Sequence, residues 1–286
     1  MQEILPDVLV ETELAGVTVG ALRTERGTIL IDSPLIAKDG QNWRAVSAKT
    51  GTSAERLLVL LDEHYDRTIG ARALRCPVLA HERTSLAFNS RPANLRVQIP
   101  RSGALWEQQE DLGNVHWAQP ELTFTRSMLV HWTEPPLYLE YHPGPAKGAI
   151  WAIQADKKVV FIGDAVTPGQ PPFLASADLP AWLETLDVLR TARFREYYII
   201  SGRGFLVNGE DIKAQQVFLK QIIKALQKIT AAGPGAHELE TQSAALLENF
   251  SPRNRTEQER FRERLSWGLE QQYLNRFTSQ KVELDE

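Results

Sequence analysis

Apolar residues in the first third of the chain form short runs separated by turn residues, a pattern typical of β-strands. The run at 57–61 is continuously apolar, which predicts a strand buried on both faces, and it ends abruptly in a polar cluster at 62–67. The other elements predicted here are equally short: strands at 16–22, 28–32 and 77–80, and helices at 69–74 and after His81.

A second group of strands follows an irregular, proline- and glycine-containing segment at 89–120. Its predicted strands lie at 127–132, 137–141, 149–153 and 159–162, with a hairpin turn at 156–158. Beyond them the spacing of apolar residues becomes mostly helical. The sequence predicts helices at 179–189 and 212–229, a strand at 197–200, a break at 233–235 and a helical tail at 243–277.

The strands therefore fall into two groups, each followed by helix. This order favours an α+β fold in which two mixed sheets pack face to face with helices outside, followed by a helical C-terminal extension. We expect residues 1–235 to form one domain and residues 236–286 to pack on it.

Composition narrows the function classes. The 286 residues carry 32 Lys and Arg against 36 Asp and Glu, a formal net charge of −4, which argues against nucleic acid as an obligatory partner. The one cysteine, Cys76, excludes an intramolecular disulfide and lies in an apolar run, as expected for a packed thiol. Without a signal-peptide pattern or an apolar run near the ~20 residues that span a bilayer, we expect a cytoplasmic protein with no membrane partner.

Candidate chemistry gathers at the ends of predicted buried strands, where a rigid sheet positions loop residues. Four such polar segments occur, at 62–67, 142–148, 163–164 and 201–204.

The order and spacing of these segments resemble the metallo-β-lactamase superfamily. Its first signature, His-x-His-x-Asp-His with a following Gly, corresponds to Asp62-x-His64-x-Asp66-Arg67 and Gly70. Three other segments are also similar: a strand ending in Asp at 29–34, a strand delivering a metal-bridging Asp at 160–164, and 201–204 in place of Pro-Gly-His-Gly. The resemblance covers residues 8–230 and implies a four-layer αβ/βα sandwich with a site along one edge of the sheets.

The resemblance also implies two metal ions held by five His and two Asp, and here most of these ligands are replaced. Asp62, Arg67 and Arg203 stand at His positions, and a fourth His is replaced by Pro145 or Lys147. Arginine has no lone pair to give a metal, so we expect no metal at the second site. Weak candidate ligands for the first site remain, namely Asp62, His64 and Asp164. We therefore expect no cofactor, or at most one weakly bound metal ion.

The replacements compensate one another in charge, because arginine can neutralise carboxylates that have lost a metal. We therefore predict a remnant, salt-bridged site and assign no catalytic residue. Its members are Asp62, His64, Asp66, Arg67, Asp164, Arg203 and Lys147.

Simpler structural roles remain open for some of these residues. His64 as a hydrogen-bonded member of a salt-bridge network is favoured over His64 as a metal ligand. Asp66 can begin a helix beside a solvated Arg67, and Asp164 can cap a turn, although the agreement of four motifs favours the site interpretation. The segment 253–264 is typical of a solvated helix face, and Trp106 lies in a segment that overhangs the site in the family.

Three functions are consistent with this pattern. The first is a pseudoenzyme that binds a small-molecule ligand. The second is a hydrolase of an ester, thioester or phosphodiester that uses one metal ion at Asp62, His64 and Asp164. The third is an interaction protein that forms a homodimer through the C-terminal helices.

Overall fold

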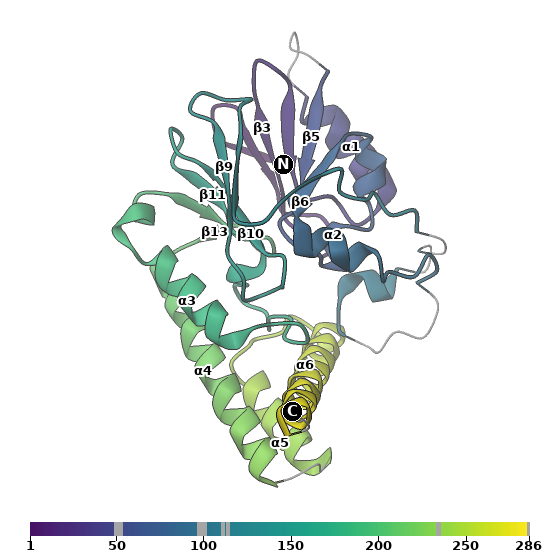
Figure 1. The fold of residues 1–286 in the computed structure, drawn as a ribbon, viewed down its shortest axis with the longest axis vertical. Coiled ribbons are helices and arrows are strands. Elements are labelled where there is room, and N and C mark those ends of the chain that lie inside the picture. Colours follow the sequence, from purple (N-terminus) through teal and green to yellow (C-terminus); the bar gives the residue numbers. More distant parts are fainter. Residues whose placement is uncertain (49–53, 96–101, 110–111, 113–114, 233–235, 285–286) are drawn as a thin grey trace.

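The computed structural model describes residues 1–48, 54–95, 102–109, 112, 115–232 and 236–284. They form two β-sheets with helices on the outside (Figure 1). The seven-stranded sheet is ordered as in the sequence: β1 (Gln2–Leu5), β2 (Val8–Glu11), β3 (Val19–Arg23), β4 (Thr28–Ile31), β5 (Arg56–Val59), β6 (Val78–His81) and β7 (Leu122–Phe124). Neighbours from β1 to β4 are antiparallel, and those from β4 to β7 are parallel.

The six-stranded sheet has the order β13-β12-β11-β10-β9-β8. Its strands are β8 (Ser127–Val130), β9 (Leu137–Tyr141), β10 (Ile150–Gln154), β11 (Val159–Phe161), β12 (Tyr198–Ile200) and β13 (Leu206–Val207). All neighbours are antiparallel except β11 and β12, which run parallel. Both sheets are therefore mixed.

The α-helices are α1 (Ala37–Val46), α2 (Glu82–Phe88), α3 (Leu179–Leu189), α4 (Gly209–Ala232), α5 (Ala236–Leu247) and α6 (Arg255–Leu284). Short 3₁₀ helices occur at η1 (Tyr65–Arg67), η2 (Ala71–Leu74), η3 (Leu105–Gln108), η4 (Gly163–Ala165) and η5 (Ala192–Phe194). In the described ranges, no helix is both long and apolar enough to cross a membrane.

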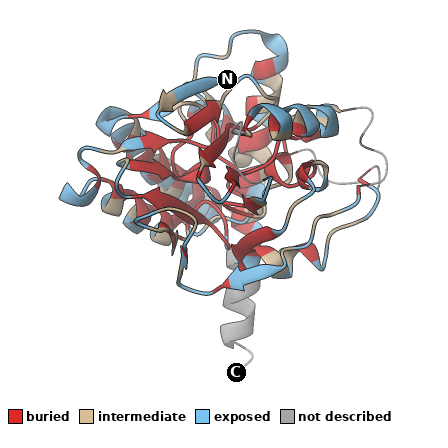
Figure 2. Ribbon diagram, turned by 90° about the horizontal axis from the view of Figure 1, so that it is seen from above, coloured by how far each residue is buried: buried red, intermediate tan, exposed pale blue. Residues whose placement is uncertain are grey.

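Alternation of buried side chains along the strands produces the layers. In β10, Ile150 and Ala152 face the other sheet, whereas Trp151 and Ile153 face the cluster formed with α3 and α4. The seven-stranded sheet likewise has an inner face against its partner and an outer face that packs against Trp43 of α1. Figure 2 shows the strands as the most buried part of the molecule. The predicted α+β sandwich of two facing sheets with outer helices is confirmed.

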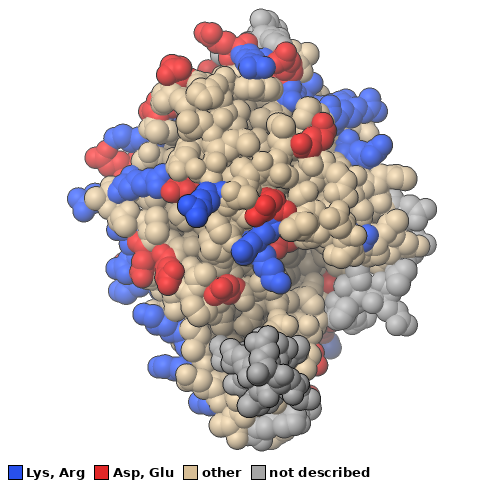
Figure 3. Space-filling view, viewed as in Figure 1, with Lys and Arg blue, Asp and Glu red and all other residues tan. Residues whose placement is uncertain are grey.

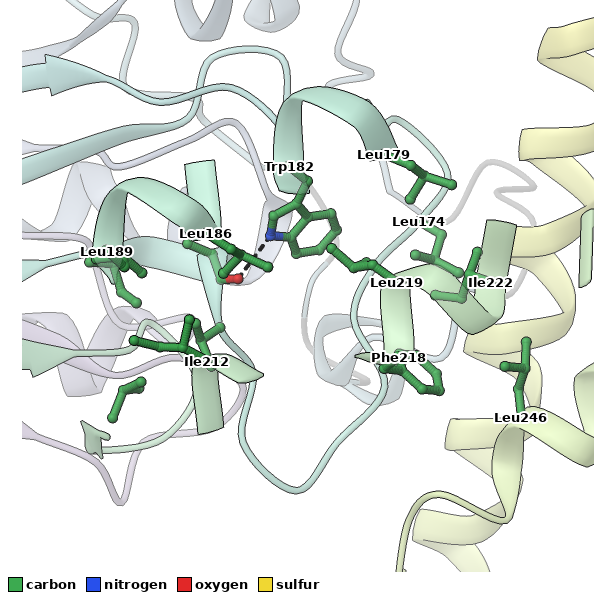
Figure 4. Close-up of a cluster of buried hydrophobic side chains, with 14 of the residues drawn as sticks. Leu174, Leu179, Trp182, Leu186, Leu189, Ile212, Phe218, Leu219, Ile222 and Leu246 are labelled. Atoms are coloured by element: carbon green, nitrogen blue, oxygen red, sulfur yellow. Dashed lines mark hydrogen bonds between the residues drawn. The ribbon is translucent and has the colours of Figure 1, made fainter. Parts of the chain in front are cut away.

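One large apolar cluster joins the six-stranded sheet to the C-terminal helices. Trp182 of α3 is fully buried between them, and its Nε1 donates to the carbonyl oxygen of Ala165 at 2.8 Å (Figure 4). Leu219 of α4, Leu246 of α5 and Leu265 of α6 belong to the same cluster. The C-terminal helices thus share a core with the sheet.

Most predicted elements occur within a few residues of their observed bounds, but some were missed. The apolar pattern gave no indication of α1, because its residues are largely polar and only two of them, Gly40 and Trp43, are buried. The predicted tail at 243–277 is two helices, α5 and α6. The predicted break at 233–235 lies outside the described residues.

The packing of α4 on the sheet can be tested with two neighbouring positions. Leu219→Ala should lower the free energy of unfolding by about 2–5 kcal/mol, because Leu219 is fully buried in the cluster. Val217→Ala should cost about 0.5 kcal/mol or less, because Val217 is 49% exposed. Urea unfolding of the two variants measures the difference, and equal midpoints would contradict the packing of α4.

Candidate functional site

Charged side chains from both sheets meet at one edge of the sandwich, beyond the carboxyl ends of parallel strands. Asp32 directly follows β4, and Asp62 lies three residues after β5, the parallel neighbour of β4. In the other sheet, Asp164 follows β11 and Arg203 follows its parallel neighbour β12. Carboxyl ends of adjacent parallel strands share one edge, so the fold brings these four residues together.

Arg67 lies at the centre of this group, and its side chain has no exposed surface. Nη1 donates to Asp32 Oδ2 at 2.7 Å, and Nη2 donates to Asp164 Oδ1. Nε lies 3.0 Å from Asp62 Oδ1 in an ion pair without hydrogen-bond geometry. A single guanidinium therefore joins carboxylates from both sheets.

Arg203 is the second buried cation, with 2% of its side chain exposed. Nε donates to Asp164 Oδ2 at 2.8 Å, and Nη1 donates to Asp66 Oδ2 at 2.8 Å and to the carbonyl oxygen of Gly16 at 2.7 Å. Nη2 lies 2.8 Å from Nδ1 of His64. Asp164 thus accepts from Arg67 with one oxygen and from Arg203 with the other.

Two glycines of the predicted motifs make room for this arrangement. A Cβ at Gly202 would lie 2.8 Å from Nη1 of Arg67, so a larger residue would displace the guanidinium. A Cβ at Gly70 would lie 2.0 Å from the carbonyl oxygen of Pro34, so the loop after η1 can approach the 33–35 segment only with glycine.

His64 acts as a hydrogen-bond acceptor in this network. Because a guanidinium can only donate, Nδ1 of His64 accepts from Arg203, and it also accepts from the backbone N–H of Asp66 at 3.3 Å. Burial and the nearby Arg203 hold the pKa of His64 well below its usual range, so the ring is neutral at pH 7. The 3.8 Å contact of His64 with Asp66 is therefore not an ion pair at that pH.

The pKa values of Asp32, Asp62 and Asp164 are shifted in different directions. Burial raises the pKa of Asp62 to about 7 and that of Asp32 to about 6, and the single Arg67 that they share does not outweigh it. Burial acts on Asp164 in the same sense, but Arg203 and Arg67 together hold its pKa well below the usual range. Four carboxylates face two guanidinium groups, so Asp62 carries part of a proton near neutral pH.

Phe173 covers the network and connects it to α6. Its ring lies 4.1 Å from the His64 ring, with the guanidinium carbons of Arg203 and Arg264 at 4.4 Å and 3.9 Å from the ring centroid. Arg264 belongs to α6, and its Nη groups donate to Gln170 Oε1 at 3.0 Å, Pro171 O at 2.9 Å and Gly103 O at 2.8 Å. The segment around Phe173 is thus held over the site by a helix far away in sequence.

Six of the seven predicted site residues lie together in this network: Asp62, His64, Asp66, Arg67, Asp164 and Arg203. Lys147 lies apart from it. Its side chain is exposed, and its backbone N–H donates to Glu63 Oε1 at 3.0 Å. Trp106, expected to overhang the site, donates its backbone N–H to Asp66 Oδ1 at 3.0 Å.

Two residues at the observed site, Asp32 and Arg264, were not among the predicted site residues. Asp32 was identified only as the end of a family-like strand. Arg264 was assigned to a solvated helix face, and this was wrong because Arg264 is 2% exposed. The same prediction holds for Arg253 and Arg255, whose side chains are 83% and 89% exposed. Phe261 and Leu265 are buried and lie on the same side of the helix as Arg264. This spacing was the signal in the sequence that could have placed Arg264 on the buried face of the helix.

The donor set does not fit the binuclear metal centre that the resemblance implies. Both oxygens of Asp164 and Nδ1 of His64 accept from arginine, and Arg67 occupies the space between three carboxylates. Among the residues that the structure describes, no group of three or more His, Cys, Asp or Glu is arranged to hold a metal ion.

The chain is similar in structure to proteins of the metallo-β-lactamase fold. It matches the sec-alkylsulfatase Pisa1 from Pseudomonas sp. with a TM-score of 0.69 and 14% identity over 96% of this chain and 49% of that one. It matches a metallo-β-lactamase family protein from Thermus thermophilus with a TM-score of 0.66 and 16% identity over 96% and 95% of the two chains. A β-lactamase domain protein from Burkholderia ambifaria gives a TM-score of 0.67 and 14% identity over 95% and 88%.

These matches place the chain in the metallo-β-lactamase fold. The chain spans about half the length of the alkylsulfatase. No protein-family model and no curated protein matches the sequence.

Removal of Arg203 tests the strength of the network. Arg203→Ala leaves the buried Asp66 and one oxygen of Asp164 without a cationic partner, so we expect a loss of about 3–5 kcal/mol in the free energy of unfolding. Arg255→Ala is the matched control on an exposed i,i+4 pair, with an expected loss of about 0.5 kcal/mol. Equal urea midpoints at pH 7 would contradict a buried network.

The raised pKa of Asp62 leads us to expect that the stability of the fold depends on pH. The folded-state pKa is about 7 and the unfolded value about 4, so the folded state binds an extra proton in this window and loses stability as pH rises through 7. Asp62→Asn removes this titration. The free energy of unfolding of the variant relative to the wild type should therefore rise between pH 5 and 7, by at most about 1.4 kcal/mol per pH unit, and level off above pH 8. A difference that does not change with pH would show that Asp62 is ionised throughout.

Proposed function

We propose that this chain is a pseudoenzyme of the metallo-β-lactamase fold that binds a small molecule, with a salt-bridged network in place of a hydrolytic metal centre. The observation that carries the proposal is Arg67. Its guanidinium is fully buried among Asp32, Asp62 and Asp164, at a position where the resemblance places a histidine ligand.

The chemistry of the donors supports this proposal. A hydrolytic metal site needs about three ligands with free lone pairs and an open position for water. Here the acceptor atoms of Asp164 and His64 are engaged by Arg203 and Arg67, which remain protonated at any physiological pH. A cation entering the network would have to displace a guanidinium from buried carboxylates.

The binding part of the proposal rests on a cavity beside the network. A cavity of about 440 Å³ is lined by Arg203, the 16–18 segment and residues of α6. One of the two cations of the remnant site therefore also faces a space that is large enough for a small ligand.

The alternative is a hydrolase with one metal ion at Asp62, His64 and Asp164. It is less well supported, because the two arginines already neutralise this group and His64 offers Nδ1 to Arg203. The metal content of the protein separates the two functions.

Elemental analysis of protein purified without chelator should find well under one zinc equivalent per chain, because two guanidinium groups occupy the positions of second-site ligands. Chelator should leave the melting temperature unchanged, and addition of Zn²⁺ or Mn²⁺ should give no saturable heat of binding. One or more tightly bound transition-metal ions, with metal-dependent turnover of an ester, thioester or phosphodiester, would support the hydrolase instead.

A double variant gives a positive control for this measurement. Arg67→His with Arg203→His puts imidazoles at two positions whose side chains both contact Asp164, and Asp66 lies beside position 203. The variant thus offers metal-ligating side chains where the wild type has guanidinium groups. If the arginines replaced ligands, the folded double variant should gain zinc relative to the wild type. Circular dichroism establishes that the variant is folded before its zinc content is compared.

A further inference from the structure

The cavity beside Arg203 has an unusual charge. Four arginines line it, Arg203, Arg253, Arg260 and Arg264, against one carboxylate, Glu257. The chain as a whole carries a net charge of −4, and on the face shown in Figure 3 acidic and basic side chains are interspersed. The lining of this cavity therefore carries an excess of positive charge that the chain as a whole does not.

The one carboxylate is already paired. Glu257 Oε1 accepts from Nη2 of Arg253 at 2.7 Å and lies 3.6 Å from Nη2 of Arg260. Its hydrogen bonds to Arg253 hold the pKa of Glu257 at about 2, despite partial burial. Glu257 therefore neutralises one of Arg253 and Arg260, and Arg203 is already paired with Asp66 and Asp164. The uncompensated positive charge of the lining belongs to Arg264 and to one of Arg253 and Arg260.

Arg264 is the cation with the weakest compensation. It is 2% exposed, its Nη groups donate to neutral acceptors, and its Nε has no hydrogen-bond partner. In the described part of the chain, no carboxylate forms an ion pair with it. Burial, Arg203 and Arg260 lower the pKa of Arg264 to about 9. A buried guanidinium beside two others of like charge is unfavourable unless an anion approaches it.

We propose that this cavity binds the carboxylate, phosphate or sulfate group of a small organic anion, with Arg260 and Arg264 as its main cationic contacts. Planar guanidinium groups suit these oxyanions, because two parallel N–H groups can reach two oxygens. The inference rests on the proposed function and specifies the chemical class of the ligand. The apolar Leu14 and Leu105 in the lining offer contacts for the remainder of the molecule.

Isothermal titration calorimetry with inorganic phosphate, sulfate and acetate, each at constant ionic strength set with chloride, tests the proposal on the full chain. At least one of these anions should bind saturably and raise the melting temperature as its concentration rises. The three arms distinguish a phosphate, a sulfate and a carboxylate group as the preferred contact.

Arg260→Gln is the informative variant, because the Arg260 side chain is 12% exposed and lies outside the network of Arg67 and Arg203. It should weaken binding about tenfold or more, as expected for loss of a charge-assisted hydrogen bond. Arg260→Lys, which keeps the charge, should recover part of the affinity. Arg255→Gln is the control on the same helix, exposed and outside the cavity, and should bind like the wild type.

Absence of saturable binding for all three anions would overturn the inference, and so would equal weakening by Arg260→Gln and Arg255→Gln. Either result leaves the metal content of the wild type unchanged. A failure of the anion site is therefore distinguishable from a failure of the pseudoenzyme proposal, which a tightly bound metal would reveal.

Discussion

The burial of the Arg67 guanidinium is the constraint on which the edge of this sandwich depends. Burying a cation completely is costly unless carboxylates compensate its charge, and for Arg67 these carboxylates come from both sheets. Asp32 and Asp62 belong to the seven-stranded sheet, and Asp164 belongs to the six-stranded one. The same ion pairs that satisfy Arg67 therefore hold the two sheets together at the place where the fold gathers its loops.

Arg203 extends this constraint outward. It shares Asp164 with Arg67 and donates to Asp66 and to Nδ1 of His64, and its guanidinium also lies against the Phe173 ring and lines the cavity. Through Phe173 and Arg264 the network reaches α6, so the C-terminal helix is part of the wall of the site. A change of charge in the cavity would therefore act on the same arginine that holds the buried carboxylates.

The fold and the buried charge network differ in how far the sequence could predict them. Strands such as β9 and the helix α3 were predicted with their observed bounds, because alternating and helical patterns of apolar residues are local properties. The short edge strands β1 and β13 were missed, since two to four residues carry little pattern and depend on a neighbouring strand for their hydrogen bonds. The order of motifs pointed to most of the charge network, yet it omitted Asp32 and placed Arg264 in solvent.

Local pattern determined the two groups of strands, the buried strand that ends at the polar cluster, and the residue types at the positions where the resemblance implies metal ligands. Tertiary structure alone decided which charges meet. Arg67 is adjacent to Asp66 in the chain, but its guanidinium pairs with Asp32, Asp62 and Asp164, whereas Asp66 pairs with Arg203. Tertiary structure also decided the environment of Arg264. Arg264 is buried, whereas Arg253, in the same Arg- and Glu-rich segment, is exposed. Spacing in the sequence shows only which residues are near one another along the chain. Burial and ion pairing depend on the other helices, strands and loops that pack against a residue in the folded protein.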